Sequence, residues 1–168
     1  MKNVIVAIVA LFICSLVNAV EMNSKDFDTA VNTAVTEIVK HEGFRSSWYK
    51  CPAGKLTIGH GLTKAFWNKS TITKEQSLAV VKQRAEAIGK EVLSMVQKPL
   101  TKNQLAALIS FTYNVGIGNF QSSTLLKELN QGNYSKVPSE MKRWVYSNKV
   151  KLNGLVSRRA SEIALFMK

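Results

Sequence analysis

The sequence predicts a mostly helical α+β fold with one small β-hairpin or sheet. The chain has 168 residues, of which 46% are hydrophobic and 20% are charged, as expected for one globular domain. Apolar residues recur at helical spacing through most of the chain. Residues 48–61 differ from this helical pattern. The stretch 52–55 has the composition of a turn. In residues 56–58, polar Thr57 separates two apolar residues, as in a short strand.

The first element is an apolar N-terminal segment. Residues 4–17 are apolar with one exception; this run is shorter than the roughly 20 residues of a membrane span and suits the core of a signal peptide. We therefore expect residues 1–19 to be an export segment and residues 20–168 to be the folded domain. Two alternatives stay open: cleavage after Ala19, or an uncleaved run extending to Val20 that anchors the protein in a membrane.

The first helix of the folded domain is predicted over Lys25 to Glu42. Its apolar side is formed by residues at helical spacing, namely Phe27, Val31, Ala34, Val35 and Ile38. Asn23 or Ser24 can cap its start, and Gly43 is expected to end it.

A long second helix follows the hairpin. The segment from Thr73 to Gln76 has the composition of a capping box, and apolar residues keep helical spacing to about Lys98, where Pro99 stops the helix. Such a helix of about 24 residues would be about 36 Å long, enough to join two lobes.

The remaining helices are predicted from caps and breakers. A second capping box begins at Thr101, and its helix runs through Tyr113 until the glycines of 116–118 interrupt it. Three further helices are expected: one from Ser122 or Ser123 to about Gly132, one opened by Pro138 that carries Trp144, and one over 154–166.

The charge balance points to an anionic partner. The chain has 23 Lys and Arg against 11 Asp and Glu, a net charge of +12, which attracts nucleic acid, an anionic membrane or a cell-wall polymer. The alternative is that the charge only keeps the surface soluble. The basic residues are spread along the chain without a run of five, so a nucleic-acid arm is not indicated. The two cysteines and two histidines lack the tight spacing of the four ligands in a zinc ribbon or finger, and we expect no metal and no cofactor.

Glu42 is a candidate general acid. It lies four residues after Ile38 and seven after Val35, so it ends the first helix on the apolar side. Burial and the negative end of the helix dipole both favour the neutral, protonated carboxyl, which a general acid needs. The alternative is a frayed, solvated glutamate.

Cys51 and Thr57 extend this candidate site. They follow in the pattern Glu42-x8-Cys51-x5-Thr57, which places a helix end opposite two strands and so forms one side of a cleft. The alternatives are a buried small side chain for Cys51 and an ordinary strand residue for Thr57.

The pattern Glu42-x8-Cys51-x5-Thr57, with the stretch Leu56 to Leu62 around it, resembles the phage-type lysozymes, or endolysins, of glycoside hydrolase family 24. The similarity covers nearly all of residues 25–168. It continues in four further stretches and one residue, namely 105–118, 120–126, 143–146, 154–159 and Glu162.

The resemblance implies a two-lobed α+β lysozyme fold with a long connecting helix and a helical C-terminal lobe. It implies hydrolysis of the β-1,4 bond between N-acetylmuramic acid and N-acetylglucosamine in peptidoglycan, with host cell lysis. By the same resemblance, Glu42 is the general acid, Thr57 holds the attacking water, and Tyr113 and Ser123 line the sugar cleft.

Two features depart from the commoner family pattern. Cys51 stands where most members have Asp, so the thiol has three possible roles: orienting water, acting as a weak base, or attacking as a thiolate. His60 lies one place early and Leu62 takes the usual position, so we assign His60 no catalytic role and expect a hairpin-surface or packing histidine.

The resemblance also implies partners and a location. The partner is peptidoglycan rather than nucleic acid, and the protein is expected to be an exported monomer in the periplasm or on the periplasmic face of the host inner membrane. Some family members are held inactive by a releasable anchor; here residues 1–20 would be that anchor, and a disulfide between Cys14 and Cys51 would block the site. A non-hydrolytic peptidoglycan-binding protein and a lytic transglycosylase remain as alternatives.

Overall fold

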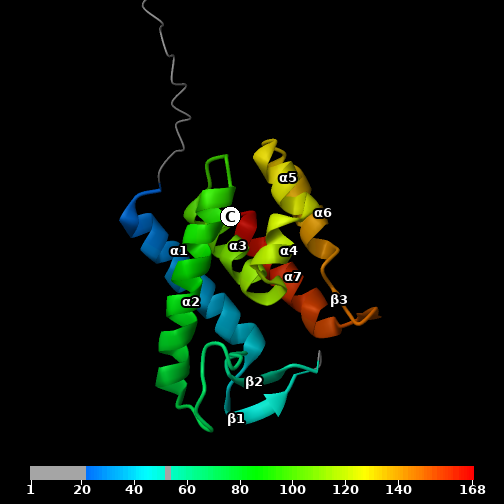
Figure 1. The fold of residues 1–168 in the computed structure, drawn as a ribbon. Helices are drawn as coiled ribbons and strands as arrows, with labels where there is room; N and C mark the ends of the chain where they lie inside the picture. The colour runs from blue at the N-terminus through cyan, green and yellow to red at the C-terminus, as the bar shows by residue number, and fades with distance from the viewer. Residues whose placement is uncertain (1–21, 52–53) are drawn as a thin grey trace, which may run out of the picture.

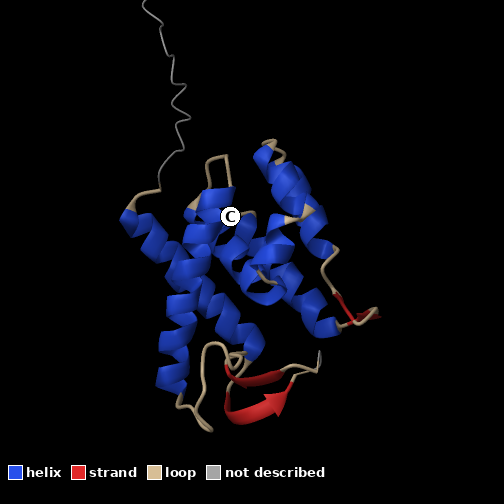
Figure 2. Cartoon of the chain, in the orientation of Figure 1, coloured by secondary structure: helices blue, strands red, loops and turns tan. Residues whose placement is uncertain are grey.

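The computed structural model describes residues 22–51 and 54–168 (Figure 1). The expected export segment, with Cys14, lies outside these residues. Within the described part of the chain, no helix is long and apolar enough to cross a membrane. Helices dominate, as expected, and the strands form two small sheets (Figure 2).

Helix α1 spans Ser24–Glu42, as its apolar pattern predicts. Asn23 is the N-cap, and its side chain accepts a hydrogen bond from the backbone N–H of Asp26 at 2.9 Å. Gly43 is the C-cap with φ 64°, a left-handed conformation that favours glycine. The helix therefore stops directly after Glu42 and presents that side chain at its end.

The first sheet is a two-stranded antiparallel hairpin. Strand β1 spans Arg45–Lys50, strand β2 spans Leu56–Gly59, and Tyr49 pairs with Thr57 across them. Of the two forms that the sequence allows, a hairpin or a three-stranded sheet, the structure has the hairpin. The chain then turns tightly, and Ile58 forms a bridge with Leu62, which makes residues 59–61 a compact turn beside the end of α1.

Helix α2, Lys74–Met95, connects the hairpin lobe to the helical lobe (Figure 1). Its predicted capping box is present, with Thr73 and Gln76 each bonding the other's backbone N–H. The helix ends three residues before the predicted Lys98. Asn130 accounts for this, because its side chain donates to the Met95 carbonyl at 3.0 Å and accepts from the next free backbone N–H, that of Gln97, at 2.8 Å.

Helix α3, Lys102–Val115, is the centre of the helical lobe. Residues 105–113 are all buried, and α1, α2 and α7 pack around them. The second predicted capping box is present between Thr101 and Gln104. This buried helix gives the helical lobe a fixed platform.

The rest of the helical lobe consists of short elements. They are α4 Ile117–Gln121, α5 Thr124–Asn130, the 3-10 helix η1 Tyr134–Lys136, α6 Val137–Lys142, strands β3 Tyr146–Ser147 and β4 Val150–Lys151, and α7 Asn153–Phe166. The predicted N-cap Ser123 is confirmed. The predicted break falls at Gly116, which is the cap shared by α3 and α4, whereas Gly118 lies within α4.

One expectation in this region was wrong, and one element was missed. Helix α6 ends at Lys142, so Trp144 lies beyond it, with its ring packed edge-on against Phe111 at 5.7 Å between centroids. The β3–β4 hairpin was not predicted. Its turn uses Asn148 and Lys149 at φ 49° and 64°, a left-handed conformation that tight hairpin turns require.

Candidate active site

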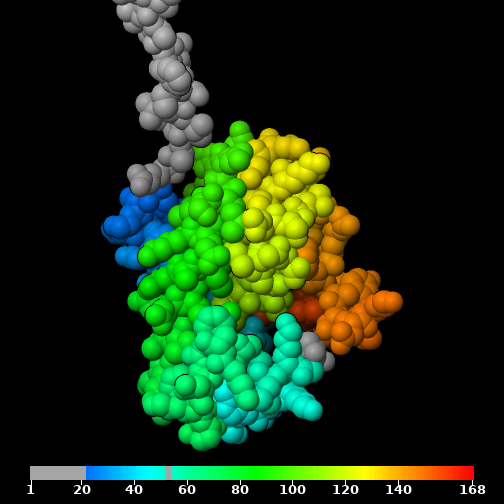
Figure 3. Space-filling view, viewed as in Figure 1, coloured from blue at the N-terminus to red at the C-terminus, as the bar shows by residue number. Residues whose placement is uncertain are grey.

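A cleft of about 650 Å³ lies between the two lobes. In Figure 3 the cyan hairpin lobe is below it and the yellow and orange helices are above it. The lining residues come from the end of α1, the β1–β2 hairpin, the α3–α4 corner, the β3–β4 hairpin and the start of α7. They are His41, Glu42, Cys51, Lys55, Asn114, Val115, Asn119, Trp144, Tyr146, Ser147, Leu152, Asn153, Gly154, Leu155 and Arg158.

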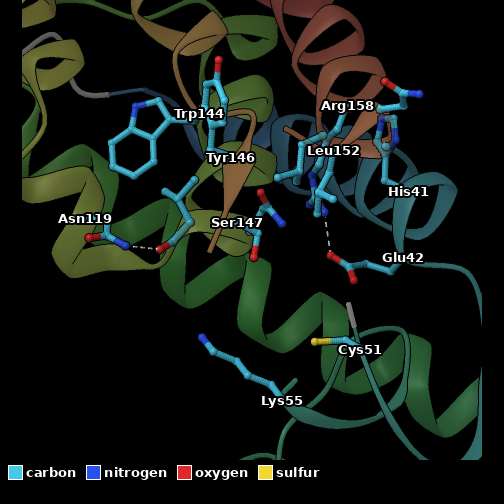
Figure 4. A pocket seen from close by; sticks show the side chains of 15 residues that line it. His41, Glu42, Cys51, Lys55, Asn119, Trp144, Tyr146, Ser147, Leu152 and Arg158 are labelled. Carbon is cyan, nitrogen blue, oxygen red and sulfur yellow. Dashed lines mark hydrogen bonds and ion pairs between the residues drawn. The ribbon is translucent and has the colours of Figure 1, made fainter. Parts of the chain in front are cut away.

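Glu42 projects into this cleft from the end of α1 (Figure 4). Its side chain is 19% exposed, and Oε1 accepts a hydrogen bond from Nη1 of Arg158 at 2.6 Å. On another side, Gly61 packs so closely that a Cβ there would lie 2.5 Å from Oε2. The carboxylate is therefore fixed between a guanidinium and bare backbone, with its remaining side open to the cleft.

Arg158 lines the cleft and pairs with Glu42, and its place in the candidate site was not predicted from the sequence. It lies on α7, 116 residues after Glu42, and its side chain is only 4% exposed. Its ion pair with Glu42 places a buried positive charge directly against the carboxyl group at the edge of the cleft. The adjacent pair Arg158-Arg159 on an amphipathic helix, followed by Glu162, was the available signal, because a buried arginine requires a carboxylate partner.

Cys51 lies in the same cleft as Glu42, and both side chains point into it in Figure 4. It directly follows β1 and is half-buried, and its thiol has no disulfide partner among the described residues. Its backbone N–H donates to the Lys55 carbonyl at 2.9 Å, and its carbonyl accepts from Gly54 at 2.8 Å. These two bonds fix the backbone of Cys51 in the hairpin turn.

Thr57 is on β2 and is only 6% exposed. Among the described residues, it is not one of those that line the cleft. Its hydroxyl points to the Tyr49 carbonyl at 3.5 Å, a distance at which a hydrogen bond is weak. The Thr57 hydroxyl therefore loses only a weak hydrogen bond when it turns to another partner.

Tyr113 and Ser123 are buried, and neither is among the described residues that line the cleft. The Tyr113 hydroxyl donates to the His60 carbonyl at 2.9 Å, and burial raises its pKa to about 12. Ser123 caps α5, because its hydroxyl accepts from the Leu126 N–H at 3.1 Å and donates to the Phe120 carbonyl at 2.7 Å.

His60 is 1% exposed, so its interpretation as a packing residue is confirmed and the surface alternative was wrong. Its backbone N–H donates to Oγ of Ser77 at 3.0 Å, and its ring Nδ1 is hydrogen-bonded to the same hydroxyl at 2.9 Å. The ring also packs against Phe44 at 5.3 Å between centroids. Burial lowers the pKa of His60, and the positive charge of Lys74 lowers it further.

Within residues 22–51 and 54–168, no group of three or more His, Cys, Asp or Glu side chains could hold a metal ion. The described residues that line the cleft supply one carboxylate, one thiol, and the polar and basic side chains around them.

Comparisons with known proteins agree with this geometry. The Phage lysozyme family profile matches residues 39–162. An endolysin of Acyrthosiphon pisum secondary endosymbiont phage 1 is 37% identical over 133 residues, which cover 77% of this chain and 91% of that protein. A SAR-endolysin of bacteriophage PS119 is 33% identical over 72% of this chain and 73% of that protein.

A solved structure is also similar. The muramidase domain of SpmX from Asticaccaulis excentricus superposes with a TM-score of 0.72 at 33% identity, covering 80% of this chain and 95% of that one.

Proposed function

The chain belongs to the phage lysozyme family, and we propose that Glu42 is the general acid with which it cleaves peptidoglycan. As a lysozyme-type endolysin, it is a glycoside hydrolase that degrades this polymer. The bond cleaved is the β-1,4 linkage between N-acetylmuramic acid and N-acetylglucosamine. One observation carries the proposal: among the described residues that line the cleft, Glu42 is the only carboxylic acid.

In the proposed step, the protonated Glu42 gives its proton to the glycosidic oxygen. The bond between that oxygen and the anomeric carbon breaks through a transition state with oxocarbenium-ion character. Water then adds its hydroxyl group to the anomeric carbon and releases one proton. This proton replaces the one that Glu42 gave to the leaving oxygen. Arg158 and Gly61 support this role because they hold the carboxyl in one orientation, and a fixed orientation accelerates reaction.

Most glycosidases use a second carboxylate, and we propose that Cys51, which lines the same cleft as Glu42, takes its part. We propose that its thiol acts on the other face of the sugar ring, and the three chemistries open to it give different products. Attack by a thiolate forms a covalent intermediate and retains the anomeric configuration. Direct attack by a water that Cys51 orients or deprotonates inverts it. The anomeric form of the first product, measured by NMR, separates these routes.

Thr57 is proposed to hold the attacking water. Its weak contact with the Tyr49 carbonyl supports this, because a hydroxyl without a strong partner is free to bind water. Tyr113 and Ser123 are proposed to shape the cleft through packing rather than to bind sugar, since their hydroxyl groups are already hydrogen-bonded inside the protein.

The proposed place of action is the periplasm or the periplasmic face of the host inner membrane. Residues 1–19 would carry the chain there, as a cleaved signal peptide or, extended to Val20, as a releasable anchor. The apolar run in the sequence and the SAR-endolysin relatives support this. The net charge of +12 favours encounter with an anionic cell wall.

A lytic transglycosylase is the second candidate, because the single carboxylic acid among the described lining residues is what that reaction needs. Purified residues 20–168 acting on isolated sacculi distinguish the two. We expect mass spectrometry to find fragments with reducing ends. Anhydro-muramic ends would instead identify a transglycosylase, and intact sacculi would identify a non-hydrolytic binding protein.

A further inference from the structure

A fully buried carboxylate lies behind the candidate active site. Glu162, on α7, is 0% exposed. Its Oε1 accepts hydrogen bonds from Oγ of Ser110 at 2.8 Å, from Nε of Arg158 at 3.0 Å and from Nη2 of Arg159 at 3.1 Å. Its Oε2 lies 2.8 Å from Nε of Arg159. One hydroxyl and two guanidinium groups therefore surround this carboxylate inside the protein.

Arg158 is shared between two carboxylates. It donates from Nε to Glu162 and from Nη1 to Glu42, while Nη2 donates to the Ser110 carbonyl at 3.2 Å. The guanidinium is rigid and planar, so its bonds to Glu162 and to Ser110 fix the direction in which Nη1 meets Glu42. Two buried groups, the Glu162 carboxylate and the Ser110 carbonyl, therefore fix the position of Arg158 beside Glu42.

The charges of this network depend on Glu42. With Glu42 ionised, two arginines and two glutamates balance. With Glu42 protonated, the network has one excess positive charge, and buried excess charge is unfavourable. Without Glu162 the excess would be two charges with Glu42 protonated and one with it ionised, so the protonated form would become still less favourable.

We propose that Glu162 is a positioning residue that sets the pH at which Glu42 ionises, acting through Arg158. The inference rests on the proposed role of Glu42 as general acid. The negative charge of Glu162 partly neutralises Arg158. The attraction of Arg158 for ionised Glu42 is therefore weaker, and part of Glu42 stays protonated at the pH at which the enzyme works. It touches neither the cleft nor the substrate.

The other titratable groups around Glu42 come from separate elements. His41 precedes it on α1 and is paired with Glu37 at 2.8 Å. Cys51 lies across the cleft, and the charge of Glu42 acts on both His60 and Tyr113. None of these groups bonds to Glu162, so a change at Glu162 reaches Glu42 through the arginines.

The test is the pH dependence of kcat/KM on isolated sacculi, measured with the full chain and Glu162→Gln. A general acid must be protonated, so activity falls as pH rises through its ionisation. We expect this alkaline limb to move to lower pH in the variant by on the order of one unit, about a tenfold loss of rate on that limb. Glu91→Gln, the same change at an exposed position, should leave the limb where it is.

Arg159→Gln gives the opposite expectation and guards against a folding artefact. It removes a positive charge from the network and leaves Arg158 as the one charged partner of Glu162 among the described residues, so the limb should move to higher pH. Loss of folded protein lowers activity at every pH and does not move the limb in opposite directions. If the limb stays at the wild-type pH in both variants, or in whichever of them folds, the inference is wrong.

The carboxyl ¹³C chemical shift of Glu42, followed by NMR as pH changes, separates this inference from the proposed function. If the shift titrates at lower pH in Glu162→Gln while the rate profile does not move, the charge sharing is supported and Glu42 is not the acid. If neither moves while Glu42→Gln is inactive, the proposed function stands and the inference is overturned.

Discussion

The backbone of Gly61 packs directly against the carboxylate of Glu42. Gly61 has φ 74°, and a Cβ at this position would lie 2.5 Å from Oε2 of Glu42. Both the left-handed backbone and the close approach require glycine. The turn that carries Gly61 is fixed by His60, which bonds to Ser77 on α2 and to Tyr113 on α3. The hairpin lobe thus supplies one wall of the Glu42 site through backbone alone.

Gly61→Ala should therefore impair both activity and stability. The added methyl group displaces the Glu42 carboxylate, and a misplacement of about 1 Å can cost about 100-fold in rate. The strained backbone should lower the free energy of unfolding by about 1–3 kcal/mol. We expect kcat/KM on sacculi to fall at least about tenfold.

Gly118→Ala is the matched control, because its φ is ordinary and an added Cβ meets nothing within 4 Å. It should keep wild-type rate and stability. A Gly61→Ala enzyme as fast as this control would show that the contact with Glu42 does not matter for catalysis.

Glu42→Gln should abolish lysis while the fold persists. Glutamine keeps the size and hydrogen bonding of the side chain but has no acidic proton, and general acid catalysis contributes about 10²- to 10⁴-fold. Circular dichroism should show an unchanged helical fold. More than about a tenth of wild-type activity in the variant would remove Glu42 from the mechanism.

The elements that follow from local sequence were predictable. Both capping boxes form, at Thr73 and at Thr101, because each needs only residues three positions apart. Helix α1 ends at Glu42 because Gly43 adopts a conformation that other residues avoid. Short-range rules were sufficient here, since no distant partner is involved.

Features set by distant contacts were not predictable. Helix α2 stops at Met95 because Asn130 binds its last turn. The local sequence around Met95 does not predict this contact. The β3–β4 hairpin uses Asn148 and Lys149 without a glycine, so its turn lacks the usual signal.

The candidate site was predictable only in part. The side of α1 on which Glu42 lies follows from helical spacing, but its ion pair with Arg158 joins residues 116 positions apart. Only a known fold brings those two residues together, which is why burial was foreseen for Glu42 and its charged partner was not.

Thr57→Val should slow the enzyme without unfolding it. Valine keeps the β-branched shape that a strand prefers, and the lost hydrogen bond to Tyr49 is a long one of 3.5 Å. If the hydroxyl holds the attacking water, kcat should fall on the order of tenfold or more with an unchanged melting temperature. Equal kcat values in the two proteins would leave Thr57 as an ordinary strand residue.

Cys14→Ser tests the expected redox control, although Cys14 lies outside the described residues. If Cys14 and Cys51 pair once the anchor is released, wild-type protein should need a reductant for activity, because a disulfide sulfur neither orients nor activates water. The serine variant should be active without one. Identical behaviour of the two proteins in oxidising and reducing buffer would reject the switch, and N-terminal sequencing would show whether Cys14 is retained at all.

His60 should make the free energy of unfolding decrease as pH falls below about 6.5. Burial and the charge of Lys74 lower its pKa in the folded protein, whereas the unfolded chain has the ordinary value of about 6.5. Above that value both states are neutral and the full stability is present. As pH falls below it, the unfolded state takes up the proton first, so the free energy of unfolding decreases until the lowered folded pKa is reached.

His60→Asn removes this titration and keeps a polar group near Ser77. Urea unfolding at pH 7 and pH 5 should therefore show a steeper loss of stability in the wild type than in the variant. Hydrogen bonds from neighbouring side chains lower the pKa values of Glu37 and Glu128. These two carboxyl groups lose their contribution to stability only below about pH 4.5, and they do so in both proteins. They therefore do not contribute to the difference. Parallel stability curves over pH 5–7 would mean that His60 is protonated as readily in the folded protein as in the unfolded chain, and its buried bond to Ser77 would then have to accommodate the charge.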